Sequence, residues 1–133
     1  MTTVGIATGA GRGMGYACAQ RMIGTVDTVL LVDLDADTVR ATADELNGDR
    51  TRVEPIVLDV TDVDGLERLA ARVTELGTLR SVAHAAGISP TMADWRRIFA
   101  VDLVGTARLA RALRPLATAG TASVYFELAP GMR

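Results

Sequence analysis

Short β-rich runs alternate with longer amphipathic segments along this chain. Short apolar runs bounded by turn residues are typical of strands, whereas apolar residues three and four positions apart are typical of helices. The short runs predict strands at Val4–Ala7, Thr28–Asp33, Val53–Asp59, Leu79–Ala86 and Thr121–Glu127. The amphipathic segments predict helices at Gly13–Ile23, at Asp37–Leu46, from Thr61 or Asp62 to Leu76, and from Trp95 to about Leu116.

Residues that cap or interrupt these elements support their boundaries. Gly48 and Gly77 stand just past the second and third predicted helices, where glycine commonly ends a helix. Asp35 or Asp37 is available to cap the start of the second helix. Pro55 predicts that the third strand lies at a sheet edge, because proline has no N–H to donate to a neighbouring strand.

Alternation of strands and helices predicts βαβ units and therefore a parallel sheet covered on both faces. Right-handed crossovers that start from the first strand give the order 3-2-1-4-5. We therefore expect an α/β fold, a Rossmann-type doubly wound sheet in three αβα layers that is incomplete at its carboxyl end. The 133 residues are expected to form one domain, 1–133.

A glycine-rich turn stands between the first strand and the first helix. The segment reads Thr8-Gly9-Ala10-Gly11-Arg12-Gly13-Met14-Gly15. Glycines permit a tight turn and close approach of a ligand, and the helix N-terminus offers unpaired N–H groups and the positive end of its dipole. A strand, such a turn and a helix in this order predict a site for a dinucleotide pyrophosphate.

An acidic residue ends the next strand, as dinucleotide recognition requires. The carboxylate of Asp33 is placed to accept hydrogen bonds from the two adenosine ribose hydroxyls, and its charge would repel a 2′-phosphate. Arg12 favours NADP instead, because a guanidinium can bind the 2′-phosphate. We expect Asp33 to prevail and NAD to be preferred over NADP. The alternative is that Asp33 is only a turn or cap residue.

A second acid, Asp59, follows the third strand. At the carboxyl edge of the sheet its carboxylate can accept a hydrogen bond from the adenine amino group. The alternative role is to cap the following helix, and both roles can hold.

These motifs together resemble the short-chain dehydrogenase/reductase family over residues 3 to about 127. The resemblance rests on Thr8-Gly9-x-x-x-Gly13-x-Gly15, Leu58-Asp59-Val60-Thr61, His84-Ala85-Ala86-Gly87 and Trp95 followed by Val101-Asp102-Leu103. It implies that the cofactor contacts Gly9, Arg12, Gly13, Met14, Gly15, Asp33, Leu34, Asp59, Val60, Ala85, Ala86 and Gly87. It implies hydride transfer between an alcohol or ketone and a nicotinamide, in a protein that forms homo-oligomers.

The chain departs from the family pattern where catalysis is concerned. Leu128 stands near the place of the family's catalytic serine, and neither Tyr16 nor Tyr125 begins a Tyr-x-x-x-Lys motif. No lysine occurs among the 133 residues. Asp102 replaces the asparagine that kinks a helix and holds a water of the proton relay in this family, and an ionised aspartate accepts but cannot donate hydrogen bonds.

His84 replaces the first asparagine of the family's strand motif and is the only histidine. At a buried strand position we interpret it as a core residue with its hydrogen bonds satisfied, rather than as a catalytic base.

Composition excludes several other functions. A formal net charge of −2 favours neither nucleic acid nor an anionic membrane as a partner. The single Cys18 excludes an internal disulfide and a cysteine-built metal site, and no metal is expected. No apolar run is long enough for a membrane span, so a cytoplasmic location is expected.

The leading hypothesis is the cofactor-binding half of an NAD-dependent alcohol/ketone dehydrogenase, truncated before its Tyr-x-x-x-Lys segment and without turnover by itself. A non-catalytic NAD-sensing or interaction module is the first alternative. An S-adenosylmethionine methyltransferase is a more remote one. Association is expected through the predicted long helix, which carries Ile98, Val101, Leu109 and Leu113, through the fifth strand with Val124 and Phe126, or through both.

Overall fold

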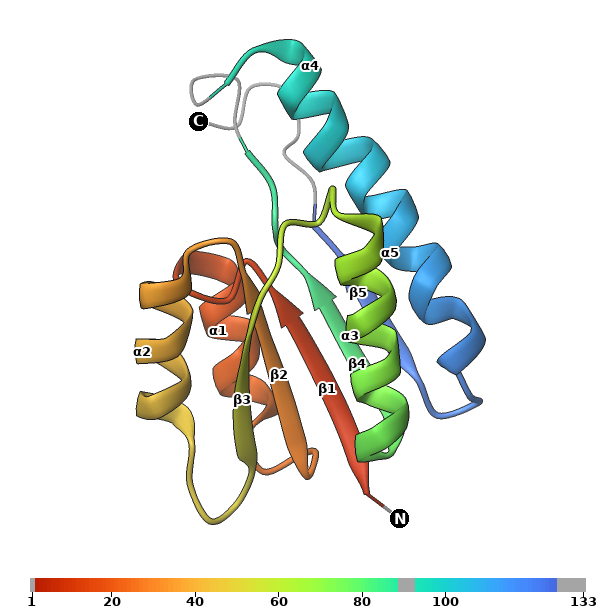
Figure 1. The fold of residues 1–133 in the computed structure, drawn as a ribbon. Helices are drawn as coiled ribbons and strands as arrows, with labels where there is room; N and C mark the ends of the chain where they lie inside the picture. Colours follow the sequence, from red (N-terminus) through yellow and green to blue (C-terminus); the bar gives the residue numbers. More distant parts are fainter. Residues whose placement is uncertain (1, 89–92, 127–133) are drawn as a thin grey trace.

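The computed structural model describes residues 2–88 and 93–126, in which strands and helices alternate. Five parallel strands form one sheet in the order β3-β2-β1-β4-β5, with helices on both of its faces (Figure 1). The elements are β1 (Thr3–Thr8), α1 (Gly13–Met22), β2 (Thr28–Asp33), α2 (Ala36–Leu46), β3 (Arg52–Val57), α3 (Val63–Leu76), β4 (Thr78–His84), α4 (Trp95–Ile98), η1 (Phe99–Gly105), α5 (Thr106–Leu113), η2 (Arg114–Leu116) and β5 (Ala122–Tyr125). The predicted doubly wound parallel sheet and its strand order are confirmed.

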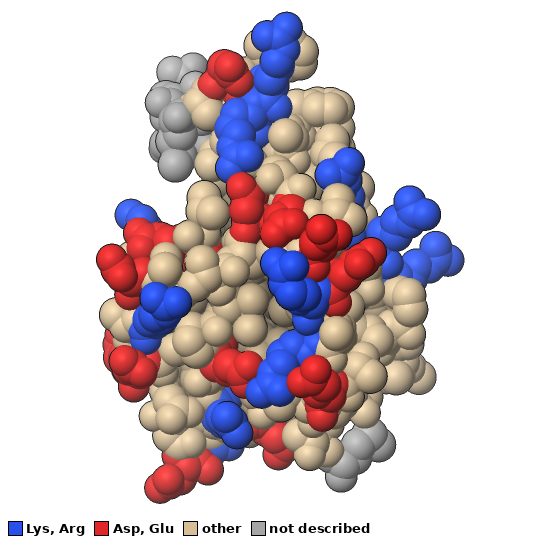
Figure 2. Space-filling model, in the orientation of Figure 1, with Lys and Arg blue, Asp and Glu red and all other residues tan. Residues whose placement is uncertain are grey.

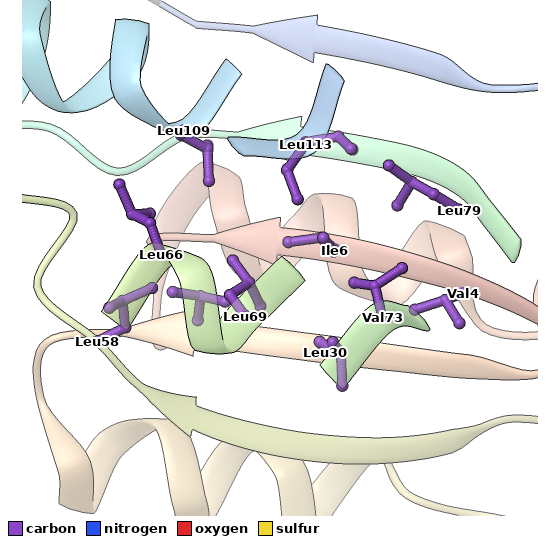
Figure 3. Close-up of a cluster of buried hydrophobic side chains, with 12 residues drawn as sticks. Val4, Ile6, Leu30, Leu58, Leu66, Leu69, Val73, Leu79, Leu109 and Leu113 are labelled. Carbon is purple, nitrogen blue, oxygen red and sulfur yellow. The ribbon is translucent and has the colours of Figure 1, made fainter. Parts of the chain in front are cut away.

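Alternate side chains of the central strands fill two separate cores. On one face of the sheet, Ile6 of β1 and Leu30 of β2 pack with Leu69 of α3 and Leu109 of α5 (Figure 3). On the other face the second core contains Ala7, Val29, Leu31, Ala19, Met22, Val39 and Ala43. Because both faces of β1 and β2 are covered, the residues between the first and last positions of each strand are apolar or glycine, which is why the strands are recognisable in the sequence.

The strand β3 lies at one edge of the sheet, as Pro55 predicts. Pro55 is in register with Leu31 of β2 and lies inside the strand. The neighbouring Glu54 accepts two hydrogen bonds from Arg72 of α3, at 2.7 and 2.8 Å, and Arg72 also donates to Glu75. This ion pair connects the edge strand to a helix.

The strands β3 and β4 end earlier than expected, and for β4 the reason lies at the carboxyl edge of the sheet. The strand β4 ends at His84, because the next two backbone N–H groups, of Ala85 and Ala86, donate to the Thr8 hydroxyl at 3.1 Å each. The strand β3 ends at Val57, so Asp59 lies in the connection to α3. The end predicted for the fifth strand, at residue 127, lies outside the described residues.

Structure also decides between the expected caps. Asp35 caps α2, since its carboxylate accepts a hydrogen bond from the Thr38 N–H at 3.1 Å. Asp62 occupies the N-cap position of α3 but makes no side-chain bond to its first turn. Its carboxylate lies 3.4 Å from Arg68 instead.

The long helix from Trp95 to Leu116 is continuous but not uniform, which corrects the expectation of a single α-helix. A π-helical segment, η1, occupies Phe99–Gly105 between α4 and α5, and a 3₁₀ turn, η2, ends the run. A π segment accommodates one more residue in its turn, and such segments are frequent at functional sites. Asp102 lies within it.

The apolar residues expected at a subunit interface lie mostly in the chain's own core. Val101, Leu109 and Leu113 are at most 6% exposed, so association through the long helix would have to use other residues. Trp95, Phe99 and Leu103 are instead 67%, 51% and 58% exposed. Spaced four residues apart, these three form an exposed apolar stripe on one side of the helix.

Arginine and acidic side chains are interspersed over the face of the molecule in Figure 2. This mixture agrees with the small net charge of −2. Within residues 2–88 and 93–126, no helix has the length and apolar character needed to cross a bilayer.

Candidate functional site

A cleft of about 640 Å³ opens where the central strands end, between the turns that follow them. Ligands of parallel α/β sheets bind at this edge, on either side of the first strand. Of the residues expected to contact a cofactor, all except Gly13 line the cleft. Six others also line it: Val32, Asp35, Leu58, Ile88, Arg97 and Val101.

The glycine-rich turn lines the cleft beside β1 through Gly9 and Arg12. Gly9 adopts φ +63°, and a Cβ there would lie 2.9 Å from the Ala86 nitrogen. A Cβ on Gly15 would collide with the Gly9 carbonyl, so α1 begins directly against the turn. Gly13, with φ +60°, turns the chain into α1 and has no atom near the place of its absent Cβ.

The N-terminus of α1 faces this cleft. Met14 and Gly15 belong to its first turn and line the cavity, and that turn contains no acidic residue. The first N–H groups of a helix have no partner within it and carry the positive end of its dipole. An anionic group can therefore be bound here by backbone atoms.

Asp33 is fixed by two backbone groups. One carboxylate oxygen accepts a hydrogen bond from the Gly11 N–H at 2.9 Å, and the other accepts from the Asp35 N–H at 3.0 Å. The side chain therefore links the end of β2 to the glycine-rich turn. Each oxygen has a further lone pair, so the carboxylate can accept additional hydrogen bonds from a ligand in the cleft.

Arg12 does not pair with Asp33. Its guanidinium lies 3.9 Å from the Asp35 carboxylate, and its side chain is 80% exposed. A pair this long and exposed constrains the arginine little.

Asp59 has partners on both sides. One oxygen accepts from the N–H and hydroxyl of Thr61, at 2.9 and 2.7 Å, and the other accepts from Arg97 at 3.1 Å. Burial raises the pKa of Asp59, but the hydrogen bonds from Thr61 and Arg97 outweigh it and hold the pKa below its usual range. The residue is not the cap of α3, a position that Asp62 occupies. The Asp59 carboxylate instead accepts the Thr61 N–H and so closes a turn before α3.

His84 is completely buried at the end of β4. Its Nδ1 lies 2.7 Å from the Thr8 hydroxyl and its Nε2 lies 2.9 Å from the Thr106 hydroxyl. The Tyr125 ring meets it edge to face, with ring centres 5.9 Å apart. Burial lowers the pKa of His84, and the negative charge of Asp102 opposes this in part. The interpretation as a satisfied core histidine is confirmed.

Asp102 of the π segment contacts Ile88, which lines the cleft, but is not itself a lining residue. Its Oδ1 accepts a hydrogen bond from the Ile88 N–H at 2.9 Å, and its backbone carbonyl accepts from the Thr106 hydroxyl at 2.7 Å. The carboxylate also lies beside Gly87, where a Cβ would be 3.2 Å from Oδ1. It therefore orders the segment that follows β4, in an accepting role only.

Sequence reasoning missed three side chains that shape the site. Arg97 reaches Asp59 across the cleft, while Thr8 and Thr106 hold His84. Thr8 has a sequence signal, because it opens the glycine motif. Arg97 and Thr106 have none, since their partners are far away along the chain. Leu128, expected near the place of a catalytic serine, lies outside the described residues.

Comparison with known proteins gives a consistent set of matches. A family model described as short chain dehydrogenase matches residues 3–124. The chain is 30% identical over 118 residues to D-threitol dehydrogenase of Mycolicibacterium smegmatis, a match that covers 83% of this chain and 45% of that protein. The chain thus spans less than half the length of this curated relative.

Two solved structures from Brucella melitensis resemble it in fold. A short-chain dehydrogenase/reductase of the glucose/ribitol dehydrogenase type aligns with a TM-score of 0.81 and 27% identity, over 93% of this chain and 55% of the other. A 3-oxoacyl-[acyl-carrier protein] reductase with bound NAD aligns with a TM-score of 0.72 and 38% identity, over 86% and 47%.

Proposed function

This chain belongs to the short-chain dehydrogenase/reductase family, and from that premise we propose that its cleft binds NAD. The proposed reaction of the whole protein is hydride transfer between a small alcohol or ketone and the nicotinamide. The name of D-threitol dehydrogenase, a relative at 30% identity, supports a small alcohol as the substrate class. The proposal places the protein in the cytoplasm.

The arrangement of Asp33 is the observation that carries this proposal. Its carboxylate is held by the Gly11 and Asp35 N–H groups beside the start of α1. A pyrophosphate at the N-terminus of α1 would bring the adjoining ribose hydroxyls to this carboxylate. The proposed ribose acceptor is thus joined to the glycine-rich turn by a direct hydrogen bond from the Gly11 N–H.

The two ends of the cleft suit the remaining parts of the cofactor. Asp59 offers a carboxylate acceptor at one end, suited to an adenine amino group. At the other end Ala85, Ala86 and Gly87 offer backbone groups and no bulk beside Gly9. When bound, NAD supplies the hydride acceptor of the reaction.

Charge favours NAD over NADP. A 2′-phosphate would lie against the Asp33 carboxylate, which is a repulsive contact in a partly enclosed site. Arg12 would have the opposite effect, but it is exposed and lies toward Asp35. The related reductase structure at 38% identity contains NAD, which agrees with this preference.

We propose further that these 133 residues bind the cofactor without turnover. In the resembled family, proton transfer requires a tyrosine whose pKa is lowered by a nearby lysine, and the 133 residues include no lysine. The same absence favours the second candidate function, an NAD-sensing module without catalysis. NADH formation from an alcohol by these residues alone, abolished in the Asp33→Arg variant, would contradict this.

Calorimetric titration of the purified chain with NAD, NADP and S-adenosylmethionine tests the proposal. We expect NAD to bind at least tenfold more tightly than NADP, and S-adenosylmethionine to release no heat of binding. Tighter binding of NADP would overturn the cofactor preference. Binding of S-adenosylmethionine alone would overturn the function.

Association into homo-oligomers is proposed through the exposed apolar stripe of Trp95, Phe99 and Leu103. These side chains lie in line on the helix and are more than half exposed. Burying such a stripe against a second copy removes apolar surface from water.

A further inference from the structure

A chain of buried and half-buried hydrogen bonds beside the cleft joins four elements, β1, β4, α5 and η1. Thr8 at the end of β1 and His84 at the end of β4 are both completely buried. Thr106, at the start of α5, continues the chain to the backbone carbonyl of Asp102 in the π segment. The separate sequence positions meet only because β1 and β4 are neighbours in the sheet.

The Thr8 hydroxyl determines the protonation of one imidazole nitrogen. Its oxygen accepts hydrogen bonds from the Ala85 and Ala86 N–H groups, both at 3.1 Å, and these use its two lone pairs. Only its own hydrogen remains, and His84 Nδ1 lies 2.7 Å away. The hydroxyl therefore donates, and Nδ1 accepts without carrying a proton.

The Thr106 hydroxyl determines the other nitrogen independently. It donates its hydrogen to the Asp102 backbone carbonyl at 2.7 Å, a group that can only accept. Its oxygen is then free to accept from His84 Nε2 at 2.9 Å. Nε2 therefore carries the proton. Both ends of the chain require the same neutral tautomer.

We infer that His84, fixed as its Nε2–H tautomer, is a positioning residue that couples the cleft floor at Ala85 and Ala86 to the π segment bearing Asp102. This inference rests on the proposed function in so far as that floor receives the nicotinamide end of NAD. The ring is not among the described groups that line the cleft. It acts through Thr8, which holds the two N–H groups.

Any other protonation state of the His84 ring would break the hydrogen bonds that Thr8 makes. A proton on Nδ1 would face an oxygen whose lone pairs are both in use, so Thr8 would have to release the Ala85 or Ala86 N–H. The same floor supports the glycine turn, since the Cβ position of Gly9 lies 2.9 Å from the Ala86 nitrogen. Asp102 of η1 is the charged group that acts on the ring, and Tyr125 of β5 contacts it edge to face.

Nitrogen NMR of the uniformly ¹⁵N-labelled chain, prepared without an affinity tag, tests the tautomer directly. The chain has one histidine, so its ring signals need no further assignment. At neutral pH we expect an unprotonated Nδ1 and a protonated Nε2 without added cofactor. A protonated Nδ1, in either the neutral or the doubly protonated ring, would overturn the inference.

Two substitutions at Thr106 test the positioning. Thr106→Val removes the acceptor of Nε2–H with little change of shape, and Thr106→Ser retains it. In the valine variant the buried Nε2–H has no acceptor, which favours moving the proton to Nδ1 and displacing the Ala85 or Ala86 N–H from Thr8. We therefore expect a mixture of ring tautomers and shifted Ala85 and Ala86 amide signals in that variant only, with NAD affinity reduced about three- to tenfold. If the valine variant keeps one tautomer, unshifted amides and full affinity, the coupling is absent.

These readouts separate this inference from the proposed function. If NAD fails to bind the unsubstituted chain, the proposed function is wrong, while the ring and amide signals still decide whether His84 positions the floor. If NAD binds but Nδ1 is protonated, the function stands and the inference falls.

Discussion

Asp33 and Asp59 both follow strands at the same edge of the sheet, yet their side chains have different partners. Asp33 accepts from two backbone N–H groups and has no cation within bonding distance in the described part of the chain. Asp59 shares its carboxylate between Thr61 and Arg97. Because no described cation pairs with Asp33 beside the cleft, we assign it the larger part in cofactor choice.

Asp33→Asn tests that assignment. The amide keeps one acceptor oxygen but loses the charge, so NAD affinity should fall about tenfold or more, since hydrogen bonds to charged acceptors are worth about 1.5–3 kcal/mol. Calorimetry measures the affinity, and Asp49→Asn, the same change in an exposed loop, should leave it unchanged. Equal affinities of the two variants would show that Asp33 is only a turn residue.

Burial of His84 predicts how stability depends on pH. The pKa of His84 is lowered in the folded chain from 6.5, so below that value the unfolded chain binds more protons. Stability should therefore fall as pH drops below about 6.5, with a slope of up to about 1.4 kcal/mol per pH unit. At higher pH the effect vanishes, because both states are neutral.

The window from pH 5 to 6.5 isolates this histidine. Asp27, Asp35, Glu54 and Asp59 have lowered pKa values, from 3.8 or 4.5, so their stabilisation is lost only at more acidic pH. Urea unfolding across the window should show the slope, and His84→Gln should abolish it. An unchanged slope in that variant would mean that His84 is not the group responsible.

The close contact of α1 with the turn makes Gly15 sensitive to a single methyl group. A Cβ there would meet the carbonyl oxygens of Gly9 and Thr8, and forcing extra volume into a packed site costs about 1–3 kcal/mol. Gly15→Ala should lose that much in urea unfolding. Gly48→Ala, at a position with free space, should change stability by less than about 0.5 kcal/mol. An unchanged free energy of unfolding in the Gly15→Ala variant would contradict the described contact.

At the scale of elements, the edge strand β3 is attached to α3 by the forked Arg72–Glu54 pair. Both side chains are partly buried, at 33% and 21% exposure. Glu54→Gln should cost about 0.5–1 kcal/mol after allowance for solvent screening. Glu75→Gln removes the more exposed partner of the same arginine and should cost less. A salt titration of stability checks the ionic origin, and equal effects of the two variants would contradict it.

Element type and order were predictable because the two buried faces of β1 and β2 leave unbroken apolar runs, as Thr28–Asp33 shows. The π segment at Phe99–Gly105 was not, since its residues follow the same amphipathic spacing as the neighbouring α-turns. The early end of β4 at His84 was also not predictable. It results from Thr8, whose hydroxyl takes the next two N–H groups from a distant part of the chain.

The residues of the candidate site also divide into those that the local sequence predicts and those that depend on contacts between distant segments. Glycines and acids at strand ends follow from local chemistry, and all the expected cofactor residues except Gly13 line the cleft. The Arg97–Asp59 and His84–Thr106 contacts join residues 38 and 22 positions apart. Such contacts depend on how the long helix lies over the sheet, which no local pattern encodes.

At the scale of the whole molecule, two surfaces compete as the site of self-association: the apolar stripe of the long helix and the edge strand β5. The stripe carries three large side chains, whereas β5 exposes Val124 and Tyr125. In sedimentation at high micromolar concentration we expect Leu103→Asp to be monomeric and Val124→Asp to remain associated. The reverse result would assign the interface to β5, and a monomeric unsubstituted chain would contradict association altogether.

The central claim is that one cleft at the carboxyl edge of the sheet holds both the pyrophosphate and the adenosine ribose of NAD. Crystals of this chain grown with NAD test it most directly. The account predicts the pyrophosphate at the backbone N–H groups of Met14 and Gly15, with the ribose hydroxyls bonded to Asp33. An empty cleft at saturating NAD, or a dinucleotide bound away from Asp33, would contradict it.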